Sequence, residues 1–315
     1  MKIKYQLSVL ATTLVIGFAP AVARADAIAQ AILDVSNFTL RTGNGVAGTT
    51  SLPNSLLSVL TPTSTPTVTS DANAKLNGVT ASTTTFGIQG NYACVGACGF
   101  YTPNTMVVGS PLATFAGASA DQSGNAISDS TGANAQTDSI VSLKPNGDGS
   151  TSSNTNLNAS FIINLAVAST IEIAFDANSY MRGMLTKNAF GTAATSWTFT
   201  IIDNLSGDEV FGWNPNGSVG GAGGVSGTVG GVEYADAFKM TDTRSAVLAG
   251  DNIIKTNNLG HFEAETGKIA VGSYRVSLRQ TTAADAKLIP EPGSLALFGV
   301  AMFGAAAAAR RRAKK

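Results

Sequence analysis

The chain has 315 residues with 20 basic and 20 acidic side chains, so its formal net charge is zero. Charged residues make up only 13% of it, about half the usual share of roughly 25%. One His and two Cys leave almost no ligands for a zinc site or a His-based catalytic centre, and the body lacks the basic excess of a nucleic-acid binder. Hydrophobic residues still make up 44%, which is enough for a folded core.

The N-terminal residues predict a secretory signal peptide over residues 1–25. Two lysines lie within the first four residues, and an uncharged apolar run follows at residues 7–18. Small residues then offer signal peptidase two A-x-A sites, at 21–23 and 23–25. We favour the second site, which makes Asp26 the first mature residue. An uncleaved N-terminal anchor is the alternative.

Residues 26–279 are predicted to form an all-β body, because apolar and polar residues alternate in several runs. The predicted inward-facing sets are Phe161, Ile163, Leu165 and Val167; Ile171, Ile173 and Phe175; Trp197, Phe199 and Ile201; Phe211 and Trp213; and Tyr274, Val276 and Leu278. Near the start, the apolar parity changes between Val35 and Phe38, which predicts a β-bulge at Ser36-Asn37. Turn signals such as Asn77-Gly78 separate the runs and favour an antiparallel β-sandwich or jelly-roll-like fold.

Three segments of the body have biased composition. Residues 61–67 and 80–85 are rich in Ser and Thr, which predicts polar loops or an edge strand, with O-glycosylation as the alternative. Residues 216–231 contain 8 glycines and predict a flexible surface loop. No Gly-Lys-Ser/Thr follows these glycines, so the segment is not a P-loop.

The two cysteines, Cys94 and Cys98, predict a disulfide, because an exported protein with an even pair close in sequence is typically oxidised. The alternative is a reactive thiol pair. It is disfavoured because the spacing is not C-x-x-C and no charged residue lies within residues 90–104 to lower a thiol pKa.

Calcium is the one cofactor that the sequence suggests. Residues 146–149 and the segment containing Asp203, Asp208 and Glu209 offer clustered oxygen ligands in tight turns. Neither segment matches the EF-hand spacing, and hairpin turns need the same residue types. The expectation is therefore no bound cofactor or metal, with the second segment as the better calcium candidate.

The residues with catalytic chemistry form no recognisable motif. His261 is the only imidazole, and no Gly-x-Ser-x-Gly motif accompanies it. Carboxylates that could pair for glycoside hydrolysis are Glu172, Asp176, Glu233 and Asp236. Solvated strand faces account for these residues better than catalytic pairs do, so we expect the protein not to be an enzyme.

The last part of the chain has three consecutive features after a polar, alanine-rich linker predicted at residues 280–289. Pro290-Glu291-Pro292 is followed by an uncharged stretch, residues 293–309, which is near the lower length limit for a membrane-spanning helix. A basic stop-transfer segment then comprises Arg310, Arg311, Arg312, Lys314 and Lys315, and the positive-inside rule places it in the cytoplasm.

Residues 290–315 closely resemble the PEP-CTERM sorting signal of Gram-negative bacteria. The resemblance implies that Pro290, Glu291 and Pro292 are recognised by an exosortase, a membrane-embedded cysteine transpeptidase-like enzyme. It also implies that the tail is removed near this motif after the precursor has been anchored in the inner membrane. A plain C-terminal membrane anchor is the alternative.

These features predict a non-enzymatic protein of the cell surface or extracellular matrix. Its expected partners are signal peptidase, the exosortase, the inner membrane before cleavage and exopolysaccharide, with no nucleic acid. The first alternative is a lectin-like carbohydrate-binding module that uses Trp213, Tyr180 or Tyr234 as platforms for sugar rings. The second alternative is a secreted hydrolase.

Overall fold

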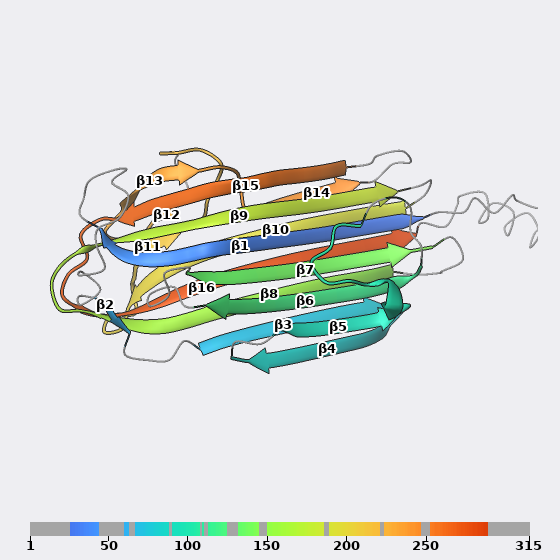
Figure 1. Cartoon of the computed structure of the whole chain (residues 1–315), viewed down its shortest axis with the longest axis horizontal. Helices are drawn as coiled ribbons and strands as arrows, with labels where there is room; N and C mark the ends of the chain where they lie inside the picture. Colours follow the sequence, from blue (N-terminus) through green and yellow to red (C-terminus); the bar gives the residue numbers. More distant parts are fainter. Residues whose placement is uncertain are drawn as a thin grey trace, which may run out of the picture.

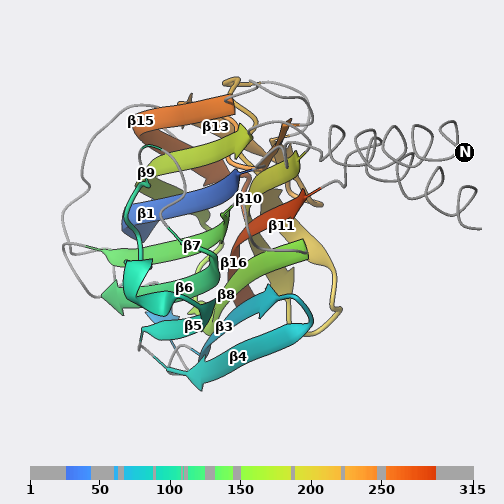
Figure 2. The ribbon, with the colours of Figure 1, turned by 90° about the vertical axis from the view of Figure 1, so that its right-hand side faces the viewer.

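The computed structural model describes residues 26–43, 60–62, 67–87, 90–107, 109, 113–124, 132–144, 150–185, 189–220, 224–246 and 253–288. These residues form two antiparallel β-sheets that pack face to face (Figures 1 and 2). The predicted all-β, antiparallel class is confirmed. The predicted signal peptide and C-terminal helix lie outside the described residues, and no helix within those residues is long and apolar enough to cross a membrane.

The first sheet has seven strands. In spatial order they are β13 (Gly231–Asp236), β15 (Ile253–Thr266), β9 (Thr170–Leu185), β1 (Ala27–Gly43), β7 (Ala133–Leu143), β6 (Phe115–Gly124) and β5 (Asn91–Gly96). Strand β1, the first of the described strands, therefore lies in the centre of its sheet between β9 and β7.

The second sheet has nine strands. In spatial order the main path is β12 (Val225–Ser226), β11 (Glu209–Trp213), β10 (Ala189–Asp203), β16 (Gly272–Leu288), β8 (Ser150–Leu165), β3 (Thr67–Leu76) and β4 (Val79–Phe86). Two short strands lie off this path: β14 (Asp242–Ala246) pairs with β10, and β2 (Leu60–Pro62) pairs with β8. The last strand, β16, is central in this sheet, between β10 and β8.

The alternating pattern produces the sandwich because every second side chain points between the sheets. All predicted inward-facing residues in β8, β9, β10, β11 and β16 are buried. Val167 is the exception, with 60% exposure, so its assignment to the inward face was wrong. Strand β8 ends at Leu165, and Val167 lies in the connection to β9, where the alternation no longer applies.

The predicted bulge in β1 is present. The registers of β1 with β7 and β9 shift between Val35 and Thr39, and Asn37 has a φ of 56°. Asn tolerates this left-handed conformation better than most residues. The bulge moves the inward face from odd to even positions, so Val35 and Phe38 both point into the core.

One half of the interior, which we call the aromatic core, is filled by large rings. Trp197, Phe175, Phe199 and Phe262 are fully buried, with Trp213 beside them at 2% exposure. The ring centroids of Phe175 and Trp197 lie 4.6 Å apart, and those of Trp197 and Trp213 lie 5.7 Å apart in an edge-on arrangement. Such pairs add about 0.5–1.5 kcal/mol each beyond area burial.

The other half, which we call the alanine core, is built mainly from small side chains. Its buried members are Ala27, Ala29, Ala72, Ala74, Ala93, Ala116, Ala118, Val141, Leu143, Leu185, Ala189, Ala246, Ala284 and Ala286. Because protein interiors are close-packed, facing alanines require the two sheets to approach more closely here than around the rings.

A buried polar layer separates the two cores. The Gln280 side-chain amide donates to the Leu33 carbonyl at 2.8 Å and to the Thr137 hydroxyl at 3.0 Å. The Ser139 hydroxyl lies 3.0 Å from that of Thr282 and 3.2 Å from that of Thr155. These bonds connect the two sheets, since Gln280, Thr282 and Thr155 belong to β16 and β8, whereas their partners belong to β1 and β7.

The predicted linker at residues 280–289 is wrong for residues 280–288, which form the second half of β16. Gln280, Thr282, Ala284 and Ala286 are all buried. Alternating Ala and Thr resemble a polar linker in sequence, yet they suit an inward face that meets small side chains. The body therefore extends to Leu288, one residue before the predicted end of the linker.

The segment at residues 216–231, predicted to be a surface loop, is largely exposed in its described part, but it contains the short strand β12. A β-carbon on Gly224 would lie 2.1 Å from Oε1 of Glu233, and one on Gly227 would lie 2.5 Å from the Val210 carbonyl oxygen. The glycines therefore permit close contact with the body. In contrast, residues 80–85 lie in the edge strand β4, one of the two placements predicted for them.

Strand β1 begins and β16 ends at the same end of the sandwich (Figure 1). Ala27 pairs with Leu185 at the end of β9, and Leu288 pairs with Ala189 at the start of β10. The alanine core lies at this end, and the aromatic core lies toward the other.

Candidate functional site

A polar groove crosses the outer face of the nine-stranded sheet. Its volume is about 390 Å³, and residues of β14, β10, β16, β8 and β3 line it. Outward-facing positions of neighbouring strands align in rows across a sheet, so the strand registers define the floor of the groove.

The first row of the floor contains small and amide side chains. The registers align Thr243 with Ala194, Ala194 with Ala283, Ala283 with Asn154, and Asn154 with Asn73. The two alanines in the middle of this row have short side chains, so the floor of the groove is low over them. We call this row the alanine–asparagine row.

The second row is continuously polar. The registers align Ser196 with Thr281, Thr281 with Asn156, and Asn156 with Asp71. At one end, the hydroxyl groups of Ser196 and Thr241 lie 3.4 Å apart. Apart from Thr243 of the short strand β14, both rows belong to long strands of the sheet interior, so their positions are fixed by continuous backbone ladders.

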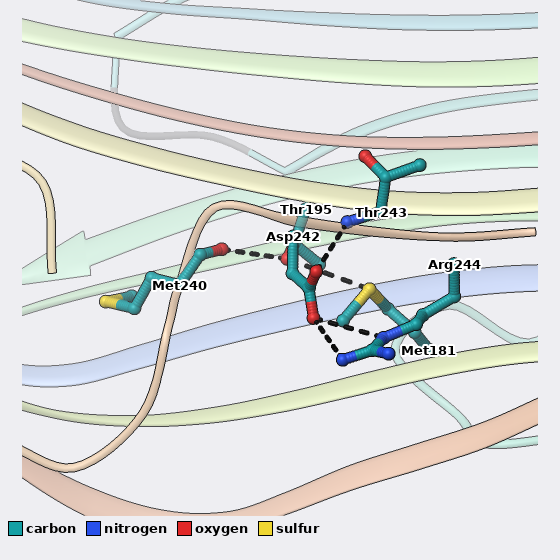
Figure 3. A network of polar contacts seen from close by, with 6 residues as sticks. All are labelled: Met181, Thr195, Met240, Asp242, Thr243 and Arg244. Atoms are coloured by element: carbon teal, nitrogen blue, oxygen red, sulfur yellow. Dashed lines mark hydrogen bonds and ion pairs between the residues drawn. The ribbon is translucent and has the colours of Figure 1, made fainter. Parts of the chain in front are cut away.

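Strand β14 forms one rim of the groove, and Figure 3 shows how it is held. The buried Thr195 hydroxyl donates to the Met240 carbonyl at 2.8 Å, which fixes the chain just before β14. The Asp242 carboxylate accepts from the Thr243 backbone N–H at 2.9 Å and from the Arg244 guanidinium at 2.9 Å. These contacts place Thr243 at the groove edge.

The charges along the groove are balanced. Asp71 and Arg279 are its only charged lining residues among those described. The Arg279 Nε donates to the Asn156 side-chain oxygen at 3.2 Å, and the Thr84 hydroxyl donates to the Asp71 carboxylate at 2.7 Å. Within the described part of the chain, the side chains of Asn73 and Asn154 make no hydrogen bond, so their amide groups are available to a ligand.

The opposite outer face, on the seven-stranded sheet, is covered by residues 97–107, which we call the strap. Gln30 holds the strap at two points: its amide nitrogen donates to the Thr105 carbonyl at 2.8 Å, and its oxygen accepts from the Val107 N–H at 3.0 Å. The Arg182 guanidinium also donates to the Val107 carbonyl. The strap begins next to the Cys94–Cys98 disulfide, whose Cα atoms lie 5.9 Å apart.

Asp138 is buried beneath the strap, and its carboxylate accepts from the Asn104 N–H at 3.0 Å and from the Gln30 amide at 3.3 Å. Burial raises the pKa of Asp138 to about 7, although these bonds and the nearby Tyr101 hydroxyl lower it in part. Burial, together with the charge of Asp138, also raises the pKa of Tyr101. Asp138 was not identified from the sequence, because its burial depends on the strap and on Gln30, which are both distant from it along the chain.

On the outer face of β9 and β15, the predicted catalytic candidates His261 and Asp176 lie in contact, and His261 also approaches Glu263. His261 Nδ1 lies 2.9 Å from Asp176 Oδ1, and His261 Nε2 lies 3.6 Å from Glu263 Oε2. Burial acts to raise the pKa of Asp176, but hydrogen bonds from Asn37 and His261 outweigh it and lower the pKa. Burial, followed by the neighbouring Glu263 carboxylate, raises the pKa of Glu172.

Glu233 and Asp236 lie elsewhere and support the glycine-rich segment. Glu233 Oε1 accepts from the Trp213 indole N–H at 2.7 Å. Asp236 Oδ2 accepts from the backbone N–H groups of Asn216 and Gly217 at 2.8 and 2.9 Å. Both carboxylates therefore accept hydrogen bonds from neighbouring residues of the body.

The three calcium candidates lie around the turn between β10 and β11. Asp203 Oδ1 accepts from the Leu205 N–H at 2.7 Å, and Glu209 Oε1 accepts from the Ser226 hydroxyl at 2.7 Å. The Asp208 N–H bonds to Ser206 Oγ. In the described ranges, no three His, Cys, Asp or Glu residues come together as a group that could hold a metal ion.

The proposed aromatic platforms for sugar rings are not exposed on the surface. Trp213 is 2% exposed and Tyr180 is 7% exposed, so the prediction that they form platforms is wrong for both. Trp213 joins the aromatic core, and the strap accounts for Tyr180, whose hydroxyl donates to the Val107 carbonyl. Tyr234 is half-buried, and its hydroxyl donates to Glu265 Oε2 at 2.7 Å.

The groove itself was not predicted from the sequence. Its amide and hydroxyl residues come from five strands, and only the registers bring them together. The alternation of Asn with inward residues in β8 was the one available signal, since outward Asn154, Asn156 and Asn158 recur at every second position.

The described body is thus an antiparallel β-sandwich whose last strand leads directly into a C-terminal segment. A family model described as the PEP-CTERM protein-sorting motif matches residues 288–312, which include Pro290, Glu291 and Pro292. The chain therefore carries this sorting motif, as the resemblance predicted, and the motif supports an exosortase-sorted extracellular protein. Comparison with the curated proteins finds no match, and comparison with the solved structures finds none either.

Proposed function

We propose that this protein is delivered to the cell surface by an exosortase and has a non-enzymatic, structural role in the envelope or exopolysaccharide matrix. The observation that carries the proposal is the sorting motif at residues 288–312, which begins at the last residue of β16. In this order, the sandwich is complete before the sorting segment starts.

The proposed processing has two cuts. Signal peptidase cleaves after Ala25, residues 293–309 hold the precursor in the inner membrane, and the exosortase then cleaves near Pro290-Glu291-Pro292. Strand β1 begins at Ala27 and β16 ends at Leu288, so both cuts fall just outside the sandwich. Processing at these places leaves every described strand intact.

The contacts of the acidic residues and of the single histidine support a structural role. Glu233 and Asp236 bind neighbouring residues of the fold, and the exposed His261 lies against the carboxylates of Asp176 and Glu263. The body between residues 26 and 289 has 12 basic and 19 acidic residues, which gives it a formal charge of −7. A mildly acidic body with few charges suits a hydrated matrix.

Intact-mass measurement of the protein recovered from the cell surface tests this proposal. We expect a chain that starts at Asp26 and ends near Pro290, while a variant without residues 290–315 reaches the medium with only the N-terminal cut. Surface protein that keeps residues 293–309 would contradict exosortase processing. Turnover of a polysaccharide that disappears on substitution of Glu172 or Asp176 would contradict the non-enzymatic role.

A further inference from the structure

We propose that the polar groove on the nine-stranded sheet binds a neutral polysaccharide chain that lies across the strands. This inference rests on the proposed function for its setting, and it names the ligand class that the body would contact in the matrix. The argument depends on the shape, charge and hydrogen-bonding groups of the groove.

The groove has the dimensions of a ligand site. Its volume of about 390 Å³ lies within the range of roughly 300–1,000 Å³ that is typical of small-molecule pockets. It extends over five adjacent strands, from β14 to β3, which at about 4.8 Å per strand spacing gives a length of roughly 19 Å. A linear oligosaccharide fits this elongated form better than a compact ligand does.

The lining chemistry favours a sugar over other linear polymers. Most lining side chains are amides or hydroxyls, which donate and accept hydrogen bonds as sugar hydroxyls do. The free amides of Asn73 and Asn154 lie side by side in the alanine–asparagine row, where the pair can bridge neighbouring hydroxyl groups. A peptide or lipid would need an apolar contact surface, and among the described lining residues only Ala194 and Ala283 have apolar side chains.

The balanced charge indicates a neutral chain. One carboxylate, Asp71, and one guanidinium, Arg279, face the groove, so the site has no field of a single sign that would attract a polyanion. Both groups already have polar neighbours in Thr84 and Asn156. Binding is therefore expected to depend on hydrogen bonds and to be insensitive to salt, unlike binding between exposed charges.

The small floor residues set the path of the ligand. Ala194 and Ala283 are register partners at the middle of the groove, with the Thr243 rim on one side and the Asn154–Asn73 pair on the other. A sugar ring resting on the two alanines places its hydroxyls near both sides. Four of the five lining strands, β10, β16, β8 and β3, are long and hydrogen-bonded on both edges, so the groups on them are held in place before the ligand arrives.

The test uses the full-length protein in a non-ionic detergent without a sugar headgroup. Its retention is measured on immobilised β-glucan, mannan and galactan, with alginate as the acidic comparison, at low salt and in 0.5 M NaCl. We expect retention on at least one neutral polymer at both salt concentrations. We also expect at least tenfold weaker binding for the double variant Asn73→Ala/Asn154→Ala and for Ala283→Leu, which raises the floor.

Asn158→Ala is the matched control, because Asn158 is on the outer face of the same strand, β8, but outside the groove lining. It should bind like the wild type, and all variants should keep the wild-type thermal transition. The inference is overturned if no neutral polymer retains the protein, if only alginate does and salt releases it, or if both groove variants bind normally. The two proposals fail separately. If the cell-surface protein is trimmed at both ends but the purified protein binds no neutral polymer, only the groove proposal is refuted. If the cell-surface protein keeps residues 293–309 but the purified protein binds, only the sorting proposal is refuted.

Discussion

The aromatic core and the alanine core stabilise the two halves of the sandwich in different ways. In the aromatic half, rings such as Trp197 and Phe175 fill the space between the sheets and bury most apolar area. In the alanine half, each side chain contributes little area, so stability must come from the close approach of two hydrogen-bonded sheets. The halves should therefore respond oppositely to substitutions that remove or add volume.

The alanine half also has support on its outside. The strap covers the outer face of the seven-stranded sheet there and is fixed by Gln30, Asp138 and Arg182. These hydrogen bonds add to the limited apolar contacts that the small side chains of the alanine core provide.

The largest effect is expected from emptying the aromatic core. Trp197→Ala removes a fully buried ring and should lower the free energy of unfolding by about 3–5 kcal/mol. Thr198→Ala, at the outward-facing neighbouring position, should change it by less than about 0.5 kcal/mol. Urea denaturation followed by tryptophan fluorescence measures both. Equal losses for the two variants would show that the ring does not support this half.

The second effect tests the outside support of the alanine half through pH. Since the folded pKa of Asp138 is raised to about 7, the folded state binds more protons than the unfolded state above about pH 4. The contribution to stability is full below pH 4 and falls as pH rises to 7, by on the order of 3 kcal/mol.

Asp138→Asn should remove this dependence, so the difference in stability between the wild type and the variant should change with pH. Asp121→Asn, at an exposed position in β6, is the matched control and should leave the wild-type slope unchanged. Denaturation midpoints at pH 4, 5, 6 and 7 provide the measurement. Parallel pH profiles for the wild type and Asp138→Asn would contradict the buried carboxyl group.

The third effect comes from overfilling the alanine core. Ala284→Leu inserts three carbon atoms between sheets that small residues bring together, and it should cost about 1–3 kcal/mol. Ala283→Leu makes the same change one residue earlier on the outward face and should cost less than about 0.5 kcal/mol. Thermal unfolding of the two variants separates the faces. If Ala284→Leu were stabilising, the alanine half would contain unfilled space.

The smallest effect concerns the polar layer between the cores. Gln280→Leu removes the donor to the Leu33 carbonyl, but it also removes a side-chain oxygen that is buried without a partner. The opposing changes should leave a net loss of about 1 kcal/mol. Urea denaturation measures it, and a gain in stability would show that the layer has a net cost in this fold.

The sequence predicted the aromatic half well and the alanine half poorly. Large apolar residues at every second position, as in Trp197, Phe199 and Ile201, give an unambiguous strand signal. The parity change between Val35 and Phe38 even located the bulge. In Gln280, Thr282, Ala284 and Ala286 the same alternation uses small or polar residues, so the segment was assigned to a linker although it is a central strand.

The sites could be predicted only where they are local in sequence. The sorting motif is contiguous, and the cysteines are four residues apart, so both were recognisable. The groove joins Asn73 with Ala283 through two strand registers, and the burial of Asp138 depends on Asn104 and Gln30. Such long-range pairings are decided by topology, which residue types alone do not specify.

The central position of β16 has a consequence for the order of folding during export. Strands β10 and β8 do not pair with each other. Each pairs with β16, which follows both of them in the chain. The nine-stranded sheet therefore stays divided into two incomplete parts until residues 272–288 have crossed the membrane. At that moment the next residues to arrive are those of the sorting motif. Closure of the sheet and presentation of the motif to its processing enzyme thus fall at the same stage of secretion.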